Sequence, residues 1–307
     1  MKQSIKNKIY NAQCIGNVEP IEYMIPYPSM RSLIEGQTIK FPNQILMQEL
    51  NITNQTFSSY VQQTSNWLED LGVNPKSRLI LPKLSYPQTE ILIYGIWNLG
   101  ASVVLPSKLS MNKVKERSGA SKLISSKTDL FLKIKKYSKK YEPRYKPLLS
   151  DEALVTFEKK TGIRLSHYNL LVNTNGIQKA IRLKSRTHIC CDIKELNTSW
   201  VVFHVILPIY CGCIYDNLKP EISIGTSGHN YILRKDLHNL NQFSKNDIGI
   251  SIENTAALSI GKKPIHLSKY DTHKDRIIIK GHSVMMGYLD DSLNKKSFQN
   301  SGLVIPF

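Results

Sequence analysis

The sequence is short of acidic residues. Aspartate and glutamate total 24 against 41 lysines and arginines, which gives a formal net charge of +17 and a pI near 9.5. An excess of this size predicts attraction to a polyanion, whether a nucleotide, CoA, nucleic acid or an acidic membrane surface. It does not choose among them.

Cysteine and long apolar runs are also scarce. The five cysteines form an odd number without a regular framework, which indicates a reducing compartment. The opening segment, MKQSIKNKIYNAQ, has no continuous apolar core, and nowhere do about 18 apolar residues run unbroken. We therefore expect no secretory signal, no transmembrane segment and a soluble cytoplasmic protein.

What the sequence does contain is an alternation of helix and strand patterns. Apolar periodicity and glycine stops predict helices at 30–35, 54–71, 87–99 and 111–117, and strands at 78–81, 102–105 and 122–124. Such alternation is typical of a parallel sheet with helices on its faces. The first 45 residues, which contain four prolines, are expected to form an irregular arm that leads into the first of these helices.

The stretch at 151–173 combines a β-type run, a polar turn and, after Ser166, an apolar segment with helical spacing. Strand, turn and helix is the layout of a phosphate-holding loop, because backbone N–H groups freed at the turn and the helix start suit an anion. Lys159, Lys160 and Arg164 would add positive charge. The alternative is an ordinary surface turn, since a single glycine gives weak loop chemistry.

The residues on either side of this turn, ALVTF before it and LSHYNLL after it, resemble the flanks of the signature loop in the adenylate-forming superfamily. That family contains acyl-CoA synthetases, acyl-AMP ligases and adenylation domains, and its loop closes over the ATP phosphates. Here the loop has shrunk to Glu-Lys-Lys-Thr-Gly, which keeps Thr161 and Gly162. The resemblance implies an α/β fold of layered sheets with flanking helices. This fold would be a shortened form of the N-terminal domain of adenylate-forming enzymes, with a small β-rich part near the C-terminus.

Two further regions resemble the scaffold of the family. They are QTFSSYVQQTSNWLEDLGVNPKSRLILP with the following ILIYGIWNLGASVVLP, and RIIIKGHSVMMGYLDD at 276–291, the clearest match. Gly281 and Gly287 in the latter allow tight backbone turns. His282 between them is expected to be a surface side chain rather than a catalyst.

The segment DIGISIENTAALSIGKKP at 247–264 resembles the part of the family that holds magnesium and adenine. Glu253 occupies the position of the glutamate that helps to hold the Mg²⁺ accompanying ATP. Gly249 stands where the family has an aromatic residue, so adenine would lose its stacking partner. The alternative for Glu253 is a plain solvent carboxylate.

The resemblance thus implies ATP or AMP and Mg²⁺ as cofactors. It assigns catalysis to Thr161 and Glu253, the metal to Glu253, and nucleotide binding to Lys159, Lys160, Thr161, Gly162, Asn254 and Thr255. The expected organisation is an arm at 1–45, α/β subdomains at 46–150 and 151–260, and a β-rich end at 261–307. Because the chain stops at Phe307, we expect the ribose-binding Asp and the C-terminal lid with its catalytic Lys to be absent.

Two other patterns allow alternatives. The segment 127–146 carries eight cations interleaved with aromatic residues, a pattern that suits binding to a nucleic-acid backbone. Alternatively, the cations form the solvent-exposed face of a helix whose buried side carries Leu130, Ile134 and Tyr137. Cysteines and histidines around the apolar run 200–209 invite a zinc site, yet lack its spacing and are more simply buried core residues. These are His188, Cys190, Cys191, His204, Cys211 and Cys213.

Three hypotheses follow. The first is a ligase-like protein, by resemblance an ATP-dependent carboxylate (fatty acid) ligase. It would bind a nucleotide or an acyl-adenylate, and its catalysis would be weak or lost. Such a protein is a pseudoenzyme unless a separate lid or an acyl-carrier partner completes it. The second is a non-enzymatic basic module that binds nucleic acid or another polyanion. The third is a fragment without selected activity.

Overall fold

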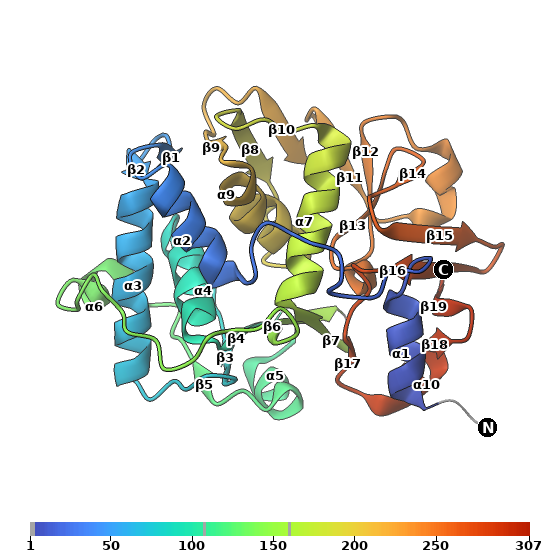
Figure 1. The fold of residues 1–307 in the computed structure, drawn as a ribbon, viewed down its shortest axis with the longest axis horizontal. Helices are drawn as coiled ribbons and strands as arrows, with labels where there is room; N and C mark the ends of the chain where they lie inside the picture. The colour runs from blue at the N-terminus through green and yellow to red at the C-terminus, as the bar shows by residue number, and fades with distance from the viewer. Residues whose placement is uncertain (1–3, 107–108, 159–160) are drawn as a thin grey trace. The chain divides into compact units, whose positions relative to one another are not determined.

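The computed structural model describes residues 4–106, 109–158 and 161–307. This part of the chain forms two compact units: a central unit, Tyr27–His167, and a terminal unit that joins Met1–Pro26 to Tyr168–Phe307. Both combine sheets with helices, so the predicted α/β class is confirmed (Figure 1). The predicted segments 1–45, 46–150, 151–260 and 261–307 stay a prediction.

The central unit is built on a sheet in the order β7-β6-β4-β3-β5. The strands are β3 (Arg78–Ile80), β4 (Ser102–Leu105), β5 (Lys122–Leu123), β6 (Glu152–Glu158) and β7 (Thr161–Ser166). Strand β3 pairs in parallel with β4 and β5, and β4 with β6, whereas β6 and β7 form an antiparallel hairpin. Strand β4 is wholly buried, as expected for a parallel strand covered on both faces. A short antiparallel pair, β1 (Ile45–Met47) and β2 (Ile52–Thr53), lies apart from these strands in sequence.

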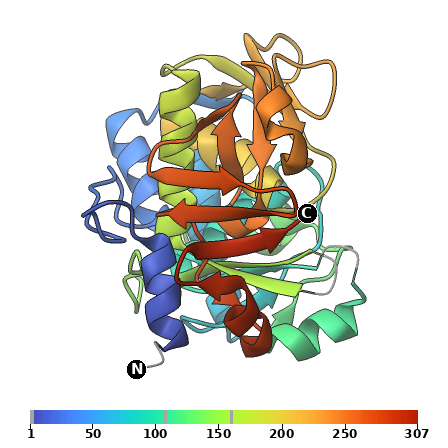
Figure 2. The same cartoon turned by 90° about the vertical axis from the view of Figure 1, so that its right-hand side faces the viewer.

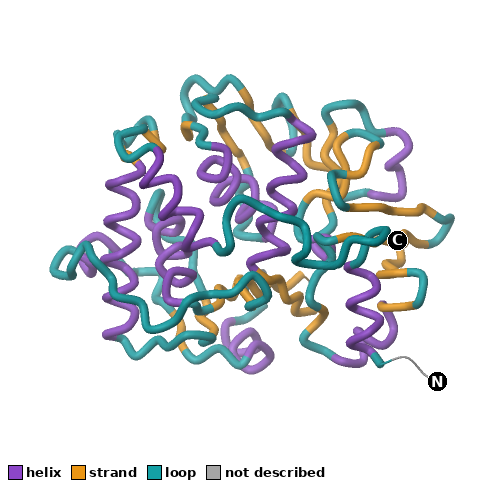
Figure 3. The backbone as a smooth tube through the Cα atoms, in the orientation of Figure 1, coloured by secondary structure: helices purple, strands orange, loops and turns teal. Residues whose placement is uncertain are grey.

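The helices of the central unit follow from their sequence patterns. They are α2 (Met30–Lys40), α3 (Asn54–Asp70), α4 (Gln88–Leu99), α5 (Met111–Ser118) and α6 (Leu130–Ile134). Thr53 caps α3 by accepting a hydrogen bond from the N–H of Thr56. Helix α4, apolar on nearly every side, is entirely buried beside α3 and ends at Gly100 with φ of +80° (Figures 1 and 3).

The terminal unit contains a larger sheet in the order β14-β13-β12-β11-β10-β8-β9. Its strands are β8 (His188–Asp192), β9 (Ile214–Tyr215), β10 (Ile222–Gly225), β11 (Tyr231–Arg234), β12 (Asp247–Ile250), β13 (Ala257–Ile260) and β14 (Lys263–Pro264). The strands β9, β8, β10, β11 and β12 are parallel, and β13 and β14 continue the sheet antiparallel.

Helical segments of the terminal unit lie before and between these strands in sequence, α7 before β8 and the others between strands. They are α7 (His167–Ile181), α8 (Thr198–Trp200), the π-helix η1 (Val201–Ile206), α9 (Leu207–Cys211) and the 3₁₀ segments η2 (Leu237–Gln242) and η3 (Ile252–Asn254). The apolar run at 200–209 is buried core as predicted, apart from half-buried His204.

The C-terminal part is β-rich, as predicted. An antiparallel sheet in the order β15-β16-β19-β18 is made by β15 (Ser268–Thr272), β16 (Arg276–Gly281), β18 (Phe298–Gln299) and β19 (Gly302–Pro306), and its three longest strands run across the face seen in Figure 2. Helix α1 (Ile5–Gln13) packs on β16, β18 and β19. The remaining elements are β17 (Gly287–Tyr288) and α10 (Asp291–Ser297).

Three predictions on these elements were wrong. The first residues are not an irregular arm, because α1 forms there with a cap from Ser4, whose hydroxyl accepts from the N–H of Asn7. Helix α2 runs to Lys40 rather than ending near Glu35. The polar turn within the stretch 151–173 leads into strand β7 and not directly into a helix.

Candidate functional site

A pocket of about 410 Å³ lies at one edge of the large sheet in the terminal unit. We call it the carboxyl-edge pocket, because four neighbouring parallel strands, β8, β10, β11 and β12, all direct their carboxyl ends to it. Its lining consists of Asp192, Ile193, Lys194, Glu195, Asn197, Ser199, Thr226, Ser227, Leu233, Lys235 and Ile250. Ligands of open α/β sheets bind outside the carboxyl ends of the strands, so the position itself indicates a binding site.

The charges in this pocket are mixed. Two carboxylates and two ammonium groups line it, and Lys235 lies 3.8 Å from Glu195. His229 lies 3.6 Å from the carboxylate of Asp192. The imidazole of His229 also covers Gly225, where an added Cβ would collide with the ring. This mixture of positive and negative side chains suits a ligand that carries both hydrogen-bond donors and anionic groups better than it suits a bare polyphosphate.

A strained turn follows β12 at the end of the 3₁₀ segment η3. Thr255 has φ of +70° and ψ of −71°, and the N–H of Ala256 donates to the carbonyl of Asn254 across it at 2.9 Å. This is a γ-turn of the rare form with positive φ, which is costly for a β-branched residue. Glu253 precedes it, half-buried, with its carboxylate accepting hydrogen bonds from Ser251 Oγ (3.2 Å) and Tyr288 Oη (3.4 Å).

Helix α7 clamps this turn from within the same unit. The amide of Asn173 donates to the carbonyls of Asn254 (3.0 Å) and Ala257 (2.9 Å), and its oxygen accepts from the N–H of Ala257 (3.2 Å). Buried oxygens of Asn254, Ser259 and Ser283 nevertheless have no partner within the described residues. Strain and unpaired buried groups concentrate at functional sites, because the surrounding structure must overdetermine them.

The loop after β16 completes the clamp. Thr255 Oγ1 donates to the carbonyl of Ser283 at 2.7 Å, and the N–H of Met285 donates to the carbonyl of Glu253 at 2.9 Å. Gly281 with φ of +138° lets this loop turn, since a Cβ there would collide with the carbonyl of Leu267 and lie 2.8 Å from Ser268 Cα. The predicted turn role of Gly281 is thus confirmed.

His282 is buried, so the prediction of a surface side chain was wrong. Its Nε2 lies 3.2 Å from the carbonyl of Val18, which can only accept, so Nε2 carries the proton and Nδ1 accepts from the Tyr168 hydroxyl at 2.5 Å. Burial lowers the pKa of His282, which keeps it neutral at neutral pH, and burial raises the pKa of Tyr168 to about 12. The imidazole therefore fastens the loop to the N-terminal segment.

The residues predicted for the phosphate loop lie in the central unit. Thr161 pairs with Glu158 at the end of the β6–β7 hairpin, and Gly162 pairs with Phe157. Lys159 and Lys160 fall outside the described residues. The structure therefore brings Glu253, Asn254 and Thr255 together in one turn of the terminal unit and places Thr161 and Gly162 on a strand of the other unit.

Arg164, expected to add charge for a phosphate, is held by a carboxylate instead. Its Nε donates to Glu152 Oε2 at 2.6 Å, while Arg78 donates two hydrogen bonds to the same carboxylate at 2.7 Å each. Burial favours the neutral acid at Glu152, but the two guanidinium groups outweigh it and lower its pKa. Arg164 is thus a structural cation of the sheet.

The basic segment 127–146 is mostly loop, with only the short helix α6 (Figure 3). Leu130 and Ile134 are buried as predicted, Tyr137 is half-buried, and every lysine and arginine of the segment is exposed. Two of these cations form ion pairs, Lys140 with Glu142 at 2.6 Å and Arg144 with Glu69 at 3.1 Å. Binding of nucleic acid there stays a prediction.

Among the described residues, no group of three or more His, Cys, Asp or Glu side chains is arranged to hold a metal ion. His204 instead shares a hydrogen bond with the Tyr215 hydroxyl at 2.7 Å, and His188 contacts Asp216 at 2.7 Å. No helix in the described ranges has the length and apolar character needed to cross a bilayer.

Sequence reasoning missed the carboxyl-edge pocket. Its residues span 192–250, and only the pairing of short parallel strands brings them to one edge. The available signal was local: apolar runs such as HICC and ISIG each end in polar residues. The crossover that normally marks parallel strands has a dozen or more residues, but β10 and β11 are joined by residues 226–230 alone.

No family model and no curated protein matches the sequence. Solved structures match along most of it. The N-terminal domain of FACL13 from Mycobacterium tuberculosis superposes with a TM-score of 0.71 at 12% identity over 91% of this chain and 99% of that chain. The anthranilate CoA ligase AuaEII in complex with anthranoyl-AMP gives 0.74 at 12% over 92% and 74%, respectively.

The Klebsiella oxytoca NpsA N-terminal subdomain in complex with 3-hydroxyanthranilyl-AMSN gives a TM-score of 0.70 at 14% identity, covering 91% of this chain and 95% of that chain. An artificially fused adenylation–PCP di-domain that contains NpsA matches at 0.69 and 12% identity, over 91% and 70%. These likenesses agree with the motifs that the sequence shares with adenylate-forming enzymes. The chain therefore has the fold of the N-terminal domain of adenylate-forming ligases.

Proposed function

We propose that this chain binds an adenine nucleotide or an acyl-adenylate in the carboxyl-edge pocket and that it activates carboxylic acids weakly or not at all. The observation that carries the proposal is the pocket itself, which lies where four parallel strands end and is lined by Ile250, three residues before Glu253 in the sequence. Its volume of about 410 Å³ falls within the range of small-molecule sites, about 300–1,000 Å³. Two structural neighbours were solved with anthranoyl-AMP and 3-hydroxyanthranilyl-AMSN.

Glu253 fits the role of a magnesium ligand. Mg²⁺ is usually held by one or two carboxylates together with phosphate oxygens and water, so a single half-buried glutamate is a sufficient protein contribution. When bound, the ion would offset negative charge on the nucleotide phosphates. Asn254 and Thr255 act through the backbone, because their side chains point to Ala257 and Ser283 and fix the turn.

Adenine would have to be held without an aromatic side chain at position 249 to stack on it, because that residue is Gly249. A Cβ on Gly249 would lie 2.6 Å from Ser259 Oγ and 3.3 Å from the Phe243 ring, so an aromatic side chain does not fit there. Recognition would then depend on hydrogen bonds from polar lining residues such as Thr226 and Ser227, together with apolar contacts from Leu233 and Ile250. We expect weaker nucleotide affinity than a stacked site would give.

Weak catalysis follows from the β6–β7 hairpin. Thr161 pairs with Glu158 and Gly162 with Phe157, so the two residues kept from the family loop are part of a strand pairing and do not form a loop that wraps a phosphate. Arg164 cannot substitute, since it is bonded to Glu152. The charge that develops on the α-phosphate during adenylation would therefore be poorly stabilised.

A carrier domain is the partner that we propose to receive the acyl group. The structural neighbour NpsA was solved as an artificial fusion to such a domain, a PCP.

The test is calorimetric titration of the chain with AMP and with an acyl-sulfamoyl adenosine. Thr226 is exposed at the end of β10 and lines the pocket, whereas Thr272 is exposed at the end of β15 and does not. We expect Thr226→Trp to fill the pocket and weaken binding at least tenfold, and the matched Thr272→Trp to bind normally. Absence of binding by the unaltered chain, or equal affinity of both variants, would overturn the proposal.

The catalytic part is tested separately by ATP–pyrophosphate exchange with a mixture of carboxylic acids. We expect exchange near background, and Glu253→Ala to lower the Mg²⁺-dependent component of ATP binding without affecting adenosine binding. Rapid exchange by the chain alone would contradict the weak-catalysis part and leave the binding site in place.

A further inference from the structure

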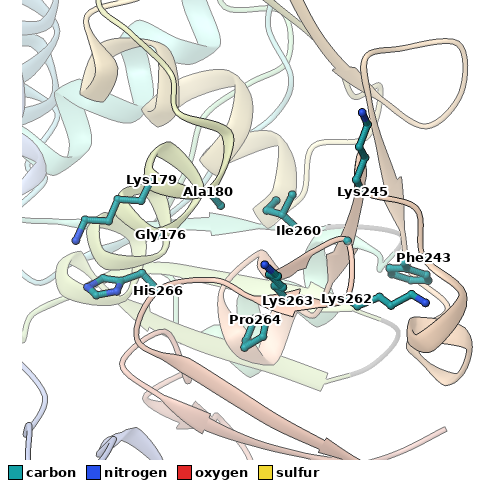
Figure 4. A pocket seen from close by; sticks show the side chains of 11 residues that line it. Gly176, Lys179, Ala180, Phe243, Lys245, Ile260, Lys262, Lys263, Pro264 and His266 are labelled. Atoms are coloured by element: carbon teal, nitrogen blue, oxygen red, sulfur yellow. The ribbon is translucent and has the colours of Figure 1, made fainter.

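A second hollow in the terminal unit is bordered almost entirely by basic and apolar side chains. Its volume is about 710 Å³, and it is lined by Gly176, Lys179, Ala180, Phe243, Lys245, Ile260, Gly261, Lys262, Lys263, Pro264 and His266. Figure 4 shows Lys179 and His266 on one side, Lys245 and Lys262 on the other, and Lys263 between them. Of the residues that the structure describes, no acidic one lines this lysine-rimmed pocket, in contrast to the carboxyl-edge pocket.

Two glycines bring these cations together from separate segments. At Gly176 on α7, a Cβ would lie 3.0 Å from Ile265 and 3.3 Å from the carbonyl of His266, so the helix approaches the segment before β15 closely. At Gly261, with φ of +54°, a Cβ would lie 3.1 Å from the carbonyl of Ser244 and 3.3 Å from Lys245 Cα. The backbone approach therefore fixes Lys179 near His266 and Lys245 near the β13–β14 turn.

The positive charges of this rim are not neutralised by any carboxylate of the described residues. Within the described part of the chain, none of the four lysines forms an ion pair, and Lys179 instead meets the hydroxyl and ring of Tyr23. The nearby carboxylate of Asp247 is bound by Arg234 at 2.8 Å and by the N–H of Ser244 at 2.7 Å. Like charges gathered on a fixed backbone repel one another, and an anion would relieve that repulsion.

The floor of the pocket is apolar. Phe243 is buried and lines the hollow together with Ile260 and Pro264. In Figure 4 its ring lies next to Lys262, and Ile260 and Pro264 lie nearer the middle of the hollow. A ligand that fits both parts carries several negative charges and an apolar body. We propose that the lysine-rimmed pocket binds a small organic polyphosphate, with its phosphates on Lys245, Lys262 and Lys263 and its body on the floor. This site is separate from the carboxyl-edge pocket and does not depend on the function proposed for it.

Concavity favours a small molecule over a macromolecule. The volume of the pocket lies within the range of small-ligand sites. Proteins that bind nucleic acid usually carry their cations along an extended groove, whereas the cations here border one hollow. Burial, together with the charge of Lys179, lowers the pKa of His266, so lysines supply the charge at neutral pH.

The experiment is calorimetric titration with sodium tripolyphosphate at fixed ionic strength. Lys262→Gln/Lys263→Gln removes two rim charges at an exposed turn, and Lys135→Gln/Lys136→Gln is the matched control that removes two exposed charges elsewhere. We expect the rim variant to bind at least tenfold more weakly than the control. Lys245→Gln is a second variant, expected to lose affinity as well; equal melting temperatures establish that all are folded.

Undetectable tripolyphosphate binding by the unaltered chain would overturn the proposal. Equal weakening by the rim and control variants would overturn it as well, because it would show that only the net charge attracts the anion. Thr226→Trp separates the two sites, because it should leave tripolyphosphate affinity unchanged. Loss of tripolyphosphate binding in Thr226→Trp would place the anion in the carboxyl-edge pocket and reject the lysine-rimmed site. A nucleic acid that binds the rim variant less tightly than the control, with no tripolyphosphate binding, would replace the small ligand by a macromolecule.

Discussion

His167 is a buried histidine of the central unit whose ring cannot easily accept a proton. Its Nδ1 accepts a hydrogen bond from the N–H of Met30 at 3.4 Å, and Nε2 has no partner within the described residues. Burial lowers the pKa of His167 to about 4, against about 6.5 in an unfolded chain. It is the only histidine in the sequence between Tyr27 and His167.

This residue predicts how stability depends on pH. Between pH 6.5 and 4 the unfolded state binds a proton that the folded state does not, so stability is full above pH 6.5 and falls as the pH decreases towards 4. The expected loss approaches about 3 kcal/mol. Urea unfolding of the chain at pH 7.5 and 5 would detect about 2 kcal/mol of this loss, since stability falls by about 1.4 kcal/mol for each pH unit below 6.5.

The matched variant is His167→Asn, whose amide oxygen can accept from Met30 without titrating. It should be less stable at pH 7.5 but lose less stability on acidification than the unaltered chain. An identical loss in both proteins would show that carboxylates, and not His167, set the acid sensitivity.

Glu152 joins three strands of the central sheet. Its carboxylate lies on β6 and accepts from Arg78 of β3 and Arg164 of β7, and Arg78 also bonds the carbonyl of Ser118. The side chain of Glu152 is only 12% exposed. A buried charge pair contributes little net energy, but removing one member leaves the other uncompensated.

We therefore expect Glu152→Gln to destabilise the chain by about 3 kcal/mol or more. The glutamine can still accept a hydrogen bond, so the loss reports the charge left on two arginines. Glu142→Gln, which removes an exposed carboxylate paired with Lys140, should leave the urea midpoint unchanged. Equal midpoints for the two variants would contradict the structural role of the Glu152 cluster.

Strands with strong local signals were predictable. Strand β4 was expected at 102–105 and occurs there, because an apolar run stands between Gly100 and Pro106. Strand β7 was missed, since its alternation in TGIRLS is short and merges with the apolar pattern of α7. Helix α1 was missed because its stability comes from packing on β16, β18 and β19, segments far away in sequence.

The candidate site was only partly predictable for a similar reason. The order Glu253-Asn254-Thr255 is visible in the sequence, but the strain at Thr255 and the clamp from Asn173 are not. His282 stands between polar and glycine residues, which indicates a surface turn, yet the carbonyl of Val18 gives its ring a buried partner. Contacts across 264 residues of chain leave no local signal.

The whole molecule carries a net charge of +17, and much of it is exposed and unpaired. Lys133, Lys135, Lys136 and Lys139 are exposed in the basic segment and form no ion pair within the described residues. An excess of one sign destabilises the compact state by self-repulsion. Salt screens that repulsion, since the Debye length falls from about 30 Å at 0.01 M to about 10 Å at 0.1 M.

We therefore expect the melting temperature to rise when sodium chloride is increased from about 0.01 M to about 0.1 M. A gain of about 1 kcal/mol corresponds to about 2–4 °C for domains of this size. Replacing Lys133, Lys135, Lys136 and Lys139 by glutamine removes four of the net positive charges and should reduce the gain, with most of the effect seen at low salt. A melting temperature that falls with salt would contradict this prediction. It would mean that favourable ion pairs, such as Arg78 with Glu152, stabilise the folded state more than the net repulsion destabilises it.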